Sequence, residues 1–213
     1  MNKDTKVSCF VFVKEGDADE IILYESKLYK ADMIVIGAHS KEKGRKRFLG
    51  TTAQKVAHKS HLPVLVVKNT AKKSYKNIIA PTDFHKQSKQ SVLFAKNIFP
   101  TSKINIVHAS EIIYIIEGPY AAVGRDLSEY NKVAKSCAKK DLKKFMQDVS
   151  VKNGKVIDGE LDNKAALLKY IKKDSYDLVV IGSRGTAGFN ALLGSVANYI
   201  LRETTSDVLV YVP

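Results

Sequence analysis

Three glycines and one serine near the C-terminal end have a spacing that suits a main-chain site for an anion. Gly182 and Gly185 follow the unbroken apolar run of residues 178–181, and Gly194-Ser195 opens a helical pattern after eight further residues. Glycine can turn with φ > 0 and lets a phosphate approach the main chain. The free N–H groups of a helix start also favour an anion. The alternative is a tight strand-to-helix turn whose glycines serve only the geometry.

The same pattern occurs twice in the chain, at a spacing of about 145 residues. A repeat that persists over roughly fifty residues predicts two related α/β units rather than chance periodicity. The matched positions are Asp17 with Asp162, Asp32 with Asp177, residues 33–36 with 178–181, Gly37 with Gly182, Gly50-Thr51 with Gly194-Ser195, and residues 64–67 with 208–211.

The units differ in completeness. Residues 77–213 alternate five short apolar runs with helical patterns, which predicts a doubly wound parallel α/β sheet covered on both faces. We expect residues 1–69 to be a partial copy of this unit, with strands at 6–13, 33–36 and 64–67, and residues 70–76 to be a linker.

A strand order of 3-2-1-4-5 would open a crevice at the carboxyl ends of the central strands. Asp83, just past the first strand, would then lie opposite Gly182, just past the fourth. The carboxylate would accept hydrogen bonds, and the amides and hydroxyl opposite would hold an anion, which matches the polarity of a nucleotide. Asp83 could instead cap the following helix, since aspartate is common at that position.

These residues resemble the universal stress protein family, which has a Rossmann-like 3-2-1-4-5 fold and an ATP-binding branch with Gly-x2-Gly-x9-Gly-(Ser/Thr/Asn). The resemblance covers residues 77–213 as a whole domain and implies ATP or AMP, with or without Mg²⁺, as ligand. It implies that Asp83 contacts adenosine and that the main chain of Val107 meets the adenine edge. The implied nucleotide-binding set is Pro81, Thr82, Asp83, Val107, Ile181, Gly182, Arg184, Gly185, Gly194, Ser195 and Val196.

Two departures from the family pattern affect these expectations. The loop of residues 186–193 has eight residues where the family has nine, so helix and turn could be rotated relative to each other. The first unit has Ser40 in place of the second glycine and no counterpart of Asp83, so we do not expect it to bind nucleotide. It resembles only the last three strands of a domain, and its strand at residues 6–13 must pair beside residues 33–36 or with another chain. The family's last strands pair between domains, which predicts pairing of residues 64–67 with 208–212 and a homodimer.

Composition narrows the function classes. The net charge of +13 results from 35 basic and 22 acidic residues. Only five of the basic residues are arginines: Arg45, Arg47, Arg125, Arg184 and Arg202. Arginine is the usual base-reading side chain, and there is no Trp, so we favour a lysine-rich solvated surface over a nucleic-acid footprint. Residues 41–47 form a basic loop, with docking to an acidic partner as the alternative.

No stretch of the sequence predicts a membrane span or a signal peptide. With two cysteines, neither a disulfide framework nor a metal site is expected, and we predict a cytoplasmic protein.

The sequence lacks the residues of a phosphoryl-transfer site, including the Walker spacing. We therefore expect a nucleotide-binding regulatory protein of the stress response that is non-catalytic or a very slow ATPase. A weak ATP or adenylate hydrolase and a nucleotide-free interaction module are the alternatives. Arg184 could face solvent instead of phosphate, and Ser195 could be an ordinary helix cap.

Overall fold

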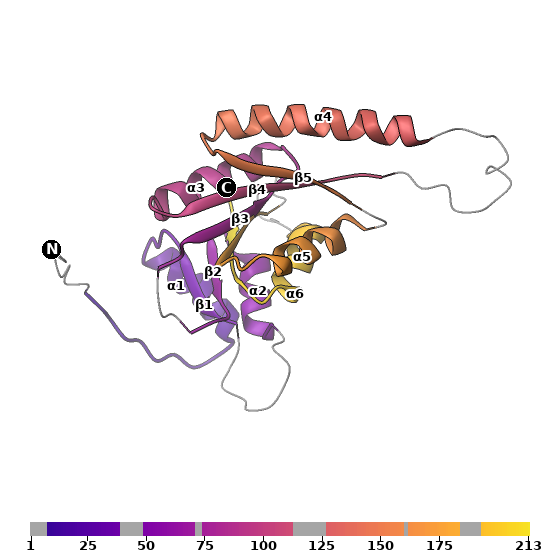
Figure 1. Cartoon of the computed structure of the whole chain (residues 1–213). Helices are drawn as coiled ribbons and strands as arrows, with labels where there is room; N and C mark the ends of the chain where they lie inside the picture. The colour runs from indigo at the N-terminus through magenta and orange to yellow at the C-terminus, as the bar shows by residue number, and fades with distance from the viewer. Residues whose placement is uncertain (1–7, 39–48, 71–73, 113–126, 160–161, 184–192) are drawn as a thin grey trace, which may run out of the picture.

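The computed structural model describes residues 8–38, 49–70, 74–112, 127–159, 162–183 and 193–213. Within them, one seven-stranded sheet runs through the molecule in the order β1-β2-β7-β6-β3-β4-β5 (Figure 1). The first unit contributes α1 (Ala18–Leu28), β1 (Ile34–Gly37), α2 (Thr51–Lys59) and β2 (Val64–Val67).

The second unit has the predicted architecture. Its strands are β3 (Asn77–Pro81), β4 (Lys103–Ser110), β5 (Asn153–Asp158), β6 (Leu178–Gly182) and β7 (Asp207–Tyr211), joined through α3 (Lys86–Ile98), α4 (Leu127–Asp148), α5 (Asn163–Lys173) and α6 (Ser195–Glu203). All neighbouring strands of this unit are parallel, in the order β5-β4-β3-β6-β7. When the five strands are numbered by their order along the second unit, this order is 3-2-1-4-5. The predicted fold class is therefore confirmed.

Helices cover the two faces of the sheet unequally. The helices α2, α5 and α6 pack on one face over a core that includes Val56, Ile171 and Ile200, and α1 packs beside them. The helices α3 and α4 cover the other face of the second unit (Figure 1). Strand residues alternate between these cores, as the pleat requires. Ile34 therefore faces the first core, whereas the side chain of Val35 is 59% exposed on the second face.

The two units are joined through their last strands. β2 pairs antiparallel with β7, with Val64 opposite Val210 and Leu65 opposite Leu209. The last-strand pairing predicted from the sequence is therefore confirmed, and it is made within one chain. Because β6 and β2 flank β7 on its two sides, both of its hydrogen-bonding edges are occupied.

One predicted strand is absent. Residues 8–13 form no strand, although their sequence is rich in β-branched and aromatic side chains. The segment instead runs along α1, where the ring of Phe12 stacks on Tyr29 with 5.3 Å between centroids. β-Propensity describes a fit to a half-buried pleated surface, and it cannot fix a strand that has no neighbour to pair with.

A buried carboxylate fastens the junction between the units. Oδ1 of Asp207 accepts hydrogen bonds from the backbone N–H groups of Lys68 (2.7 Å) and Asn69 (3.0 Å). The Asn69 side-chain amide donates to the same oxygen, and the Tyr75 hydroxyl donates to Oδ2 at 2.7 Å. The residues that follow β2 and the residue Tyr75, which precedes β3, thus bind the same carboxylate. Burial of the Tyr75 hydroxyl raises its pKa, and the hydrogen bond to the carboxylate of Asp207 raises it further.

We predict that Asp207→Ala lowers the free energy of unfolding by about 3 kcal/mol, because each partly buried donor left without a partner costs roughly 1–3 kcal/mol. Urea denaturation measures the change. Asp141→Ala, which removes an exposed carboxylate from α4, is the matched control and should stay within about 0.5 kcal/mol of wild type. Equal stability of the two variants would contradict the role assigned to Asp207.

A lysine beside this clamp gives stability a pH dependence. Nζ of Lys68 donates to the carbonyls of Leu201 (2.6 Å) and Thr204 (2.7 Å) at the end of α6. Burial lowers the pKa of Lys68 from 10.5 to about 8, against the opposing effect of Asp207 and Glu203. Between these two values the unfolded chain binds more protons than the folded one, so this group makes folding more favourable as pH rises.

We therefore predict that wild type gains about 2 kcal/mol of stability relative to Lys68→Met between about pH 8 and pH 10. Taking the difference between the two proteins cancels titrations that they share. Urea unfolding at a series of pH values measures it. A difference that does not change with pH would show that Lys68 titrates normally in the folded state.

Candidate functional site

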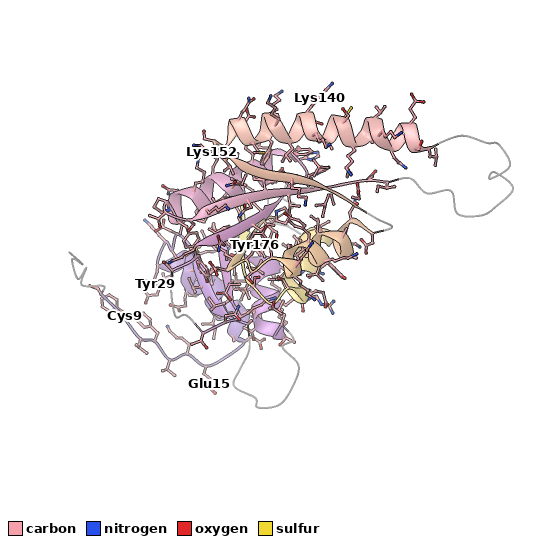
Figure 2. The ribbon with its side chains drawn as sticks, in the orientation of Figure 1. Cys9, Glu15, Tyr29, Lys140, Lys152 and Tyr176 are labelled. Carbon is pink, nitrogen blue, oxygen red and sulfur yellow. The ribbon has the colours of Figure 1, made fainter. Side chains whose placement is uncertain are left out.

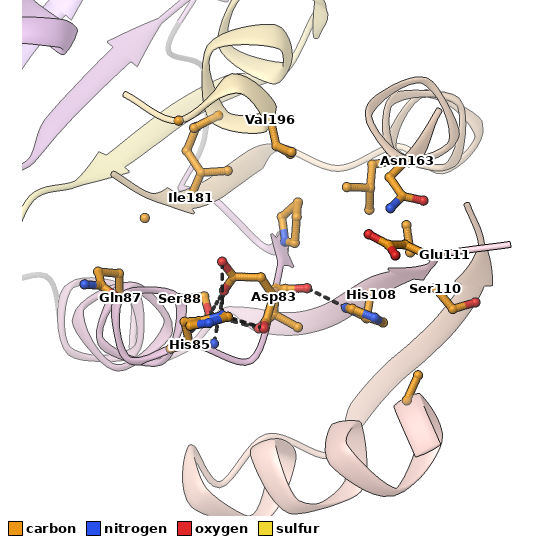
Figure 3. Close-up of a pocket in the computed structure, with 18 of the residues that line it drawn as sticks. Asp83, His85, Gln87, Ser88, His108, Ser110, Glu111, Asn163, Ile181 and Val196 are labelled. Atoms are coloured by element: carbon orange, nitrogen blue, oxygen red, sulfur yellow. Dashed lines mark hydrogen bonds and ion pairs between the residues drawn. The ribbon is translucent and has the colours of Figure 1, made fainter. Parts of the chain in front are cut away.

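A cleft of about 1100 Å³ opens at the carboxyl ends of β3, β4 and β6. The helices α3, α4, α5 and α6 supply the rest of its wall among the described residues (Figure 3). It lies where the strand order reverses direction, which is the usual ligand position in open α/β sheets. Five residues of the predicted set that line it are Pro81, Thr82, Asp83, Ile181 and Gly182, joined by Gly194 and Val196 on the α6 side.

The turn after β3 holds Asp83 in a fixed orientation. Oδ1 of Asp83 accepts from the backbone N–H of His85 (3.1 Å) and from the hydroxyl of Ser88 (2.9 Å). The residue that caps α3 is His85, so Asp83 is not the helix cap that the alternative interpretation expected, although its carboxylate holds the turn that leads into α3. Its side chain is nevertheless 59% exposed, so much of the carboxylate remains open to the cleft.

The same turn contains a residue in a disfavoured backbone conformation. Phe84 has φ of 65°, which non-glycine residues seldom adopt and which costs about 1–3 kcal/mol. Its N–H donates to Oγ1 of Thr82 at 2.9 Å, and its ring stacks on His108 with 4.2 Å between centroids. This turn is thus held by side-chain contacts against its intrinsic preference.

The hydrogen bond that His108 makes defines which of its ring nitrogens carries the proton. Its Nδ1 lies 2.8 Å from the carbonyl oxygen of Thr82. A carbonyl can only accept, so Nδ1 is the donor, and Nε2 is the acceptor in the neutral ring. His108 lines the cleft. The set of site residues implied by the sequence did not include His108, and the signal available was its position directly after Val107.

The end of β6 shows why Gly182 must be a glycine. A methyl group there would lie 3.1 Å from the backbone carbonyl group of Gln87 and 3.3 Å from the amide of Ser88. Gly182 is not among the described residues with positive φ, so the expected left-handed turn is wrong at this position. The glycine instead allows α3 to approach β6, which brings the tips of β3 and β6 to one cleft.

Ser183 is the residue that the sequence interpretation missed. It is 2% exposed and lines the cleft, yet its hydroxyl has no hydrogen-bond partner among the described residues. Its backbone N–H donates to Tyr211 O at 2.8 Å. Buried hydroxyls are normally paired, so an unpaired one in a residue that lines a cavity is a candidate hydrogen-bond partner for a ligand. Its place between Gly182 and Gly185 was the available signal.

Three helices begin at the cleft. The first backbone bonds of α3, α5 and α6 are made by Lys89, Ala166 and Asn198, which leaves the preceding N–H groups of each helix outside its own ladder. Residues at these three starts line the cleft, among them Ser88, Asn163 and Val196 (Figure 3). Their dipoles add positive potential there. Among the described residues, the lining contains no lysine or arginine, so this potential comes from main-chain groups.

Two predicted residues lie outside the described lining. Val107 is wholly buried, and its carbonyl accepts from the N–H of Thr82 at 2.9 Å, so its main chain is used by the sheet. The adenine contact implied for the main chain of Val107 stays a prediction, and the residues that follow it, His108 to Ser110, line the cleft. Ser195 is exposed at the start of α6 and makes no cap bond with its side chain. Arg184, Gly185 and most of the loop at 186–193 lie outside the described residues.

The universal stress protein family model matches residues 2–68 and 74–212. The chain belongs to the universal stress protein family. Universal stress protein A homolog 1 of Coxiella burnetii is 28% identical over 142 residues, covering 63% of this chain and 94% of that relative. Universal stress protein MJ0531 of Methanocaldococcus jannaschii is 27% identical over 140 residues, covering 64% and 81%.

Solved structures show the same fold over more of the chain. The functionally unknown protein PA1789 of Pseudomonas aeruginosa PAO1 aligns with a TM-score of 0.70 at 17% identity, covering 93% of this chain and 68% of that one. A universal stress protein from Archaeoglobus fulgidus aligns with a TM-score of 0.59 at 19% identity, covering 91% and 66%. In the part of this universal stress protein that the structure describes, no helix has the length and apolarity needed to cross a membrane.

We predict that Gly182→Ala lowers the free energy of unfolding by about 1–3 kcal/mol, because the added methyl forces the backbone of α3 away from β6. The control is Gly154→Ala in β5, where the methyl would displace the flexible side chain of Met146 instead of backbone atoms. Chemical denaturation compares the two. Equal effects would show that Gly182 is not needed for close packing.

Proposed function

We propose that this universal stress protein binds an adenine nucleotide, ATP or AMP, in the cleft and acts as a nucleotide-responsive regulator in the cytoplasm. The observation that carries the proposal is the orphaned hydroxyl of Ser183, buried at the edge of a cleft where three helices begin. Such a site offers hydrogen-bond donors to an anion without a fixed positive side chain among the described residues. A phosphate group supplies the acceptors that those donors lack.

Charges in the cleft support one orientation of the ligand. The carboxylates Asp83 and Glu111 lie on the side of β3 and β4, whereas Ser183 and the start of α6 lie on the side of β6. Phosphates placed beside the two carboxylates would be repelled, and base or ribose donors placed there would be accepted. The nucleoside therefore lies toward Asp83 and His108, and the phosphates lie toward Ser183 and Gly194.

The described lining supports binding rather than fast hydrolysis. Phosphoryl transfer uses metal-binding carboxylates and a residue that positions water at the terminal phosphate. In the orientation proposed here, Asp83 and Glu111 lie at the nucleoside end instead. No group of three or more His, Cys, Asp or Glu side chains stands together as a metal site among the described residues. Any Mg²⁺ would then be held chiefly by the nucleotide's own phosphates.

We predict that two substitutions separate the ends of the nucleotide. Ser183→Ala should weaken ATP and AMP about three- to tenfold and leave adenosine unchanged, because one neutral hydrogen bond is worth about 0.5–1.5 kcal/mol. Asp83→Asn should weaken all three ligands about tenfold, because it removes the charge but keeps an acceptor for His85 and Ser88. Isothermal titration calorimetry measures the affinities.

Asp174→Asn, at the far end of α5 from the cleft, is the matched control and should bind like wild type. Mass spectrometry of the denatured wild-type protein should detect co-purified ATP or AMP. If wild type binds neither nucleotide, or if Ser183→Ala binds both as tightly as wild type, the phosphate end is assigned wrongly. Phosphate release that continues at many turnovers per minute would favour the hydrolase instead.

A further inference from the structure

The sheet has an unpaired edge at β1. Among the described residues, β1 pairs only with β2. The N–H of Ile34 donates to Pro63 O at 2.9 Å and that of Ala38 donates to Val67 O at 2.7 Å. Because alternate residues of a strand face opposite neighbours, Val35 and Gly37 direct their N–H and C=O groups to the open side. This edge can accept one more strand.

The opposite edge of the sheet is protected, and this one is not. β5 carries Lys155 and Asp158 within an exposed strand, and Lys152 directly precedes it. Charged side chains on an edge strand oppose pairing with another chain. β1 reads Ile-Val-Ile-Gly and carries no charge, and the apolar side chain of Val35 is exposed on one face of the sheet beside the free edge. The β1 edge has the properties of a pairing surface.

Exposed apolar side chains are concentrated in the N-terminal part of the described chain. Among the described residues, twelve large hydrophobic side chains are exposed, and eight of them lie between residues 10 and 35. Exposed patches of this kind mark interaction sites in soluble proteins. The eight are Phe10, Val11, Phe12, Val13, Tyr24, Leu28, Tyr29 and Val35.

The strand-forming segment at residues 8–13 belongs to this patch but does not fill its own edge. The stack of Phe12 on Tyr29 and the 3.2 Å ion pair between Lys14 and Glu25 hold it along α1. Figure 2 shows Cys9 on this segment and Glu15 just after it, clear of the sheet, with Lys140 and Lys152 on the opposite side of the molecule. Val11 is 88% exposed, so the contacts of this segment with its own chain leave that side chain free to pack against a partner.

The geometry points to a second copy of this chain as the occupant: residues 8–13 of each copy add as a strand to the β1 edge of the other. One chain carries both halves of the contact, an unpaired edge and an unpaired strand, so a twofold dimer satisfies both at once. Main-chain bonds to Val35 and Gly37 supply the pairing, and Phe10, Val11 and Val13 supply apolar area. The surface is distinct from the β2–β7 junction and from the cleft.

Two proline variants test the pairing in the full chain. Val11→Pro changes an irregular exposed segment, and Val35→Pro changes an N–H that faces the open edge, so neither removes a hydrogen bond of the single chain. Sedimentation velocity should give wild type twice the 23.6 kDa chain mass at high concentration. Each proline variant should sediment as a single chain under the same conditions.

Matched controls separate strand pairing from general stickiness. Val11→Thr keeps a β-branched residue and should stay dimeric, and Val133→Thr on α4 should have no effect. A nitroxide on Cys9, in a Cys137→Ser background, should be immobilised in the dimer and mobile in the Val35→Pro variant. A wild type of single-chain mass at every concentration, a dimer that survives both prolines, or an immobilised label in a single chain would each overturn the proposal. The last outcome would show that the segment is held by its own chain.

Discussion

The antiparallel pairing of β2 with β7 is the constraint on which the rest of the molecule depends. It makes one sheet from two units, and it gives the first unit a neighbour that its own two strands cannot provide. Two isolated strands are at best marginally stable in water. The bonds that Asp207 accepts from Lys68, Asn69 and Tyr75 hold the chain where it leaves one unit and enters the other. The junction is therefore fixed by the main chain and by one buried carboxylate together.

The same constraint explains why only the second copy of the repeat forms a cleft among the described residues. In the second unit, β3 lies beside β6, so the tips of the two strands share a cleft. In the first unit, β1 has the position of β6 but has no described neighbour on its open side, so no turn equivalent to Thr82–Asp83 faces its end. Gly50 still caps α2 as Gly194 caps α6, with its N–H 2.8 Å from Ala38 O. The first unit thus keeps the glycine at the start of its helix, although it lacks the neighbouring strand that would form the other wall of a cleft.

The sequence predicted the fold better than it predicted the contacts. Periodicity and the repeat were enough to predict two related α/β units, because they depend on patterns spread over many residues. The strand order and the β2–β7 pairing were implied by the resemblance to the family. The sequence patterns failed for residues 8–13, since β-propensity does not reveal whether a partner strand exists. They also gave the wrong reason for Gly182, whose role depends on how closely α3 approaches β6. Ser183 became visible only through its burial and its missing partner, which no local pattern encodes.

Gly182 connects packing to the chemistry of the cleft. Its missing side chain lets the first turn of α3 lie against β6, and the start of α3 is also where Asp83 is held through His85 and Ser88. One close contact therefore positions the carboxylate that follows β3 relative to Ser183, the residue that follows β6. The strained φ of Phe84 is tolerated because Thr82 and His108 hold the same turn from the other side. Packing and site share the same residues here, so conformational strain is kept at the point where a ligand would be bound.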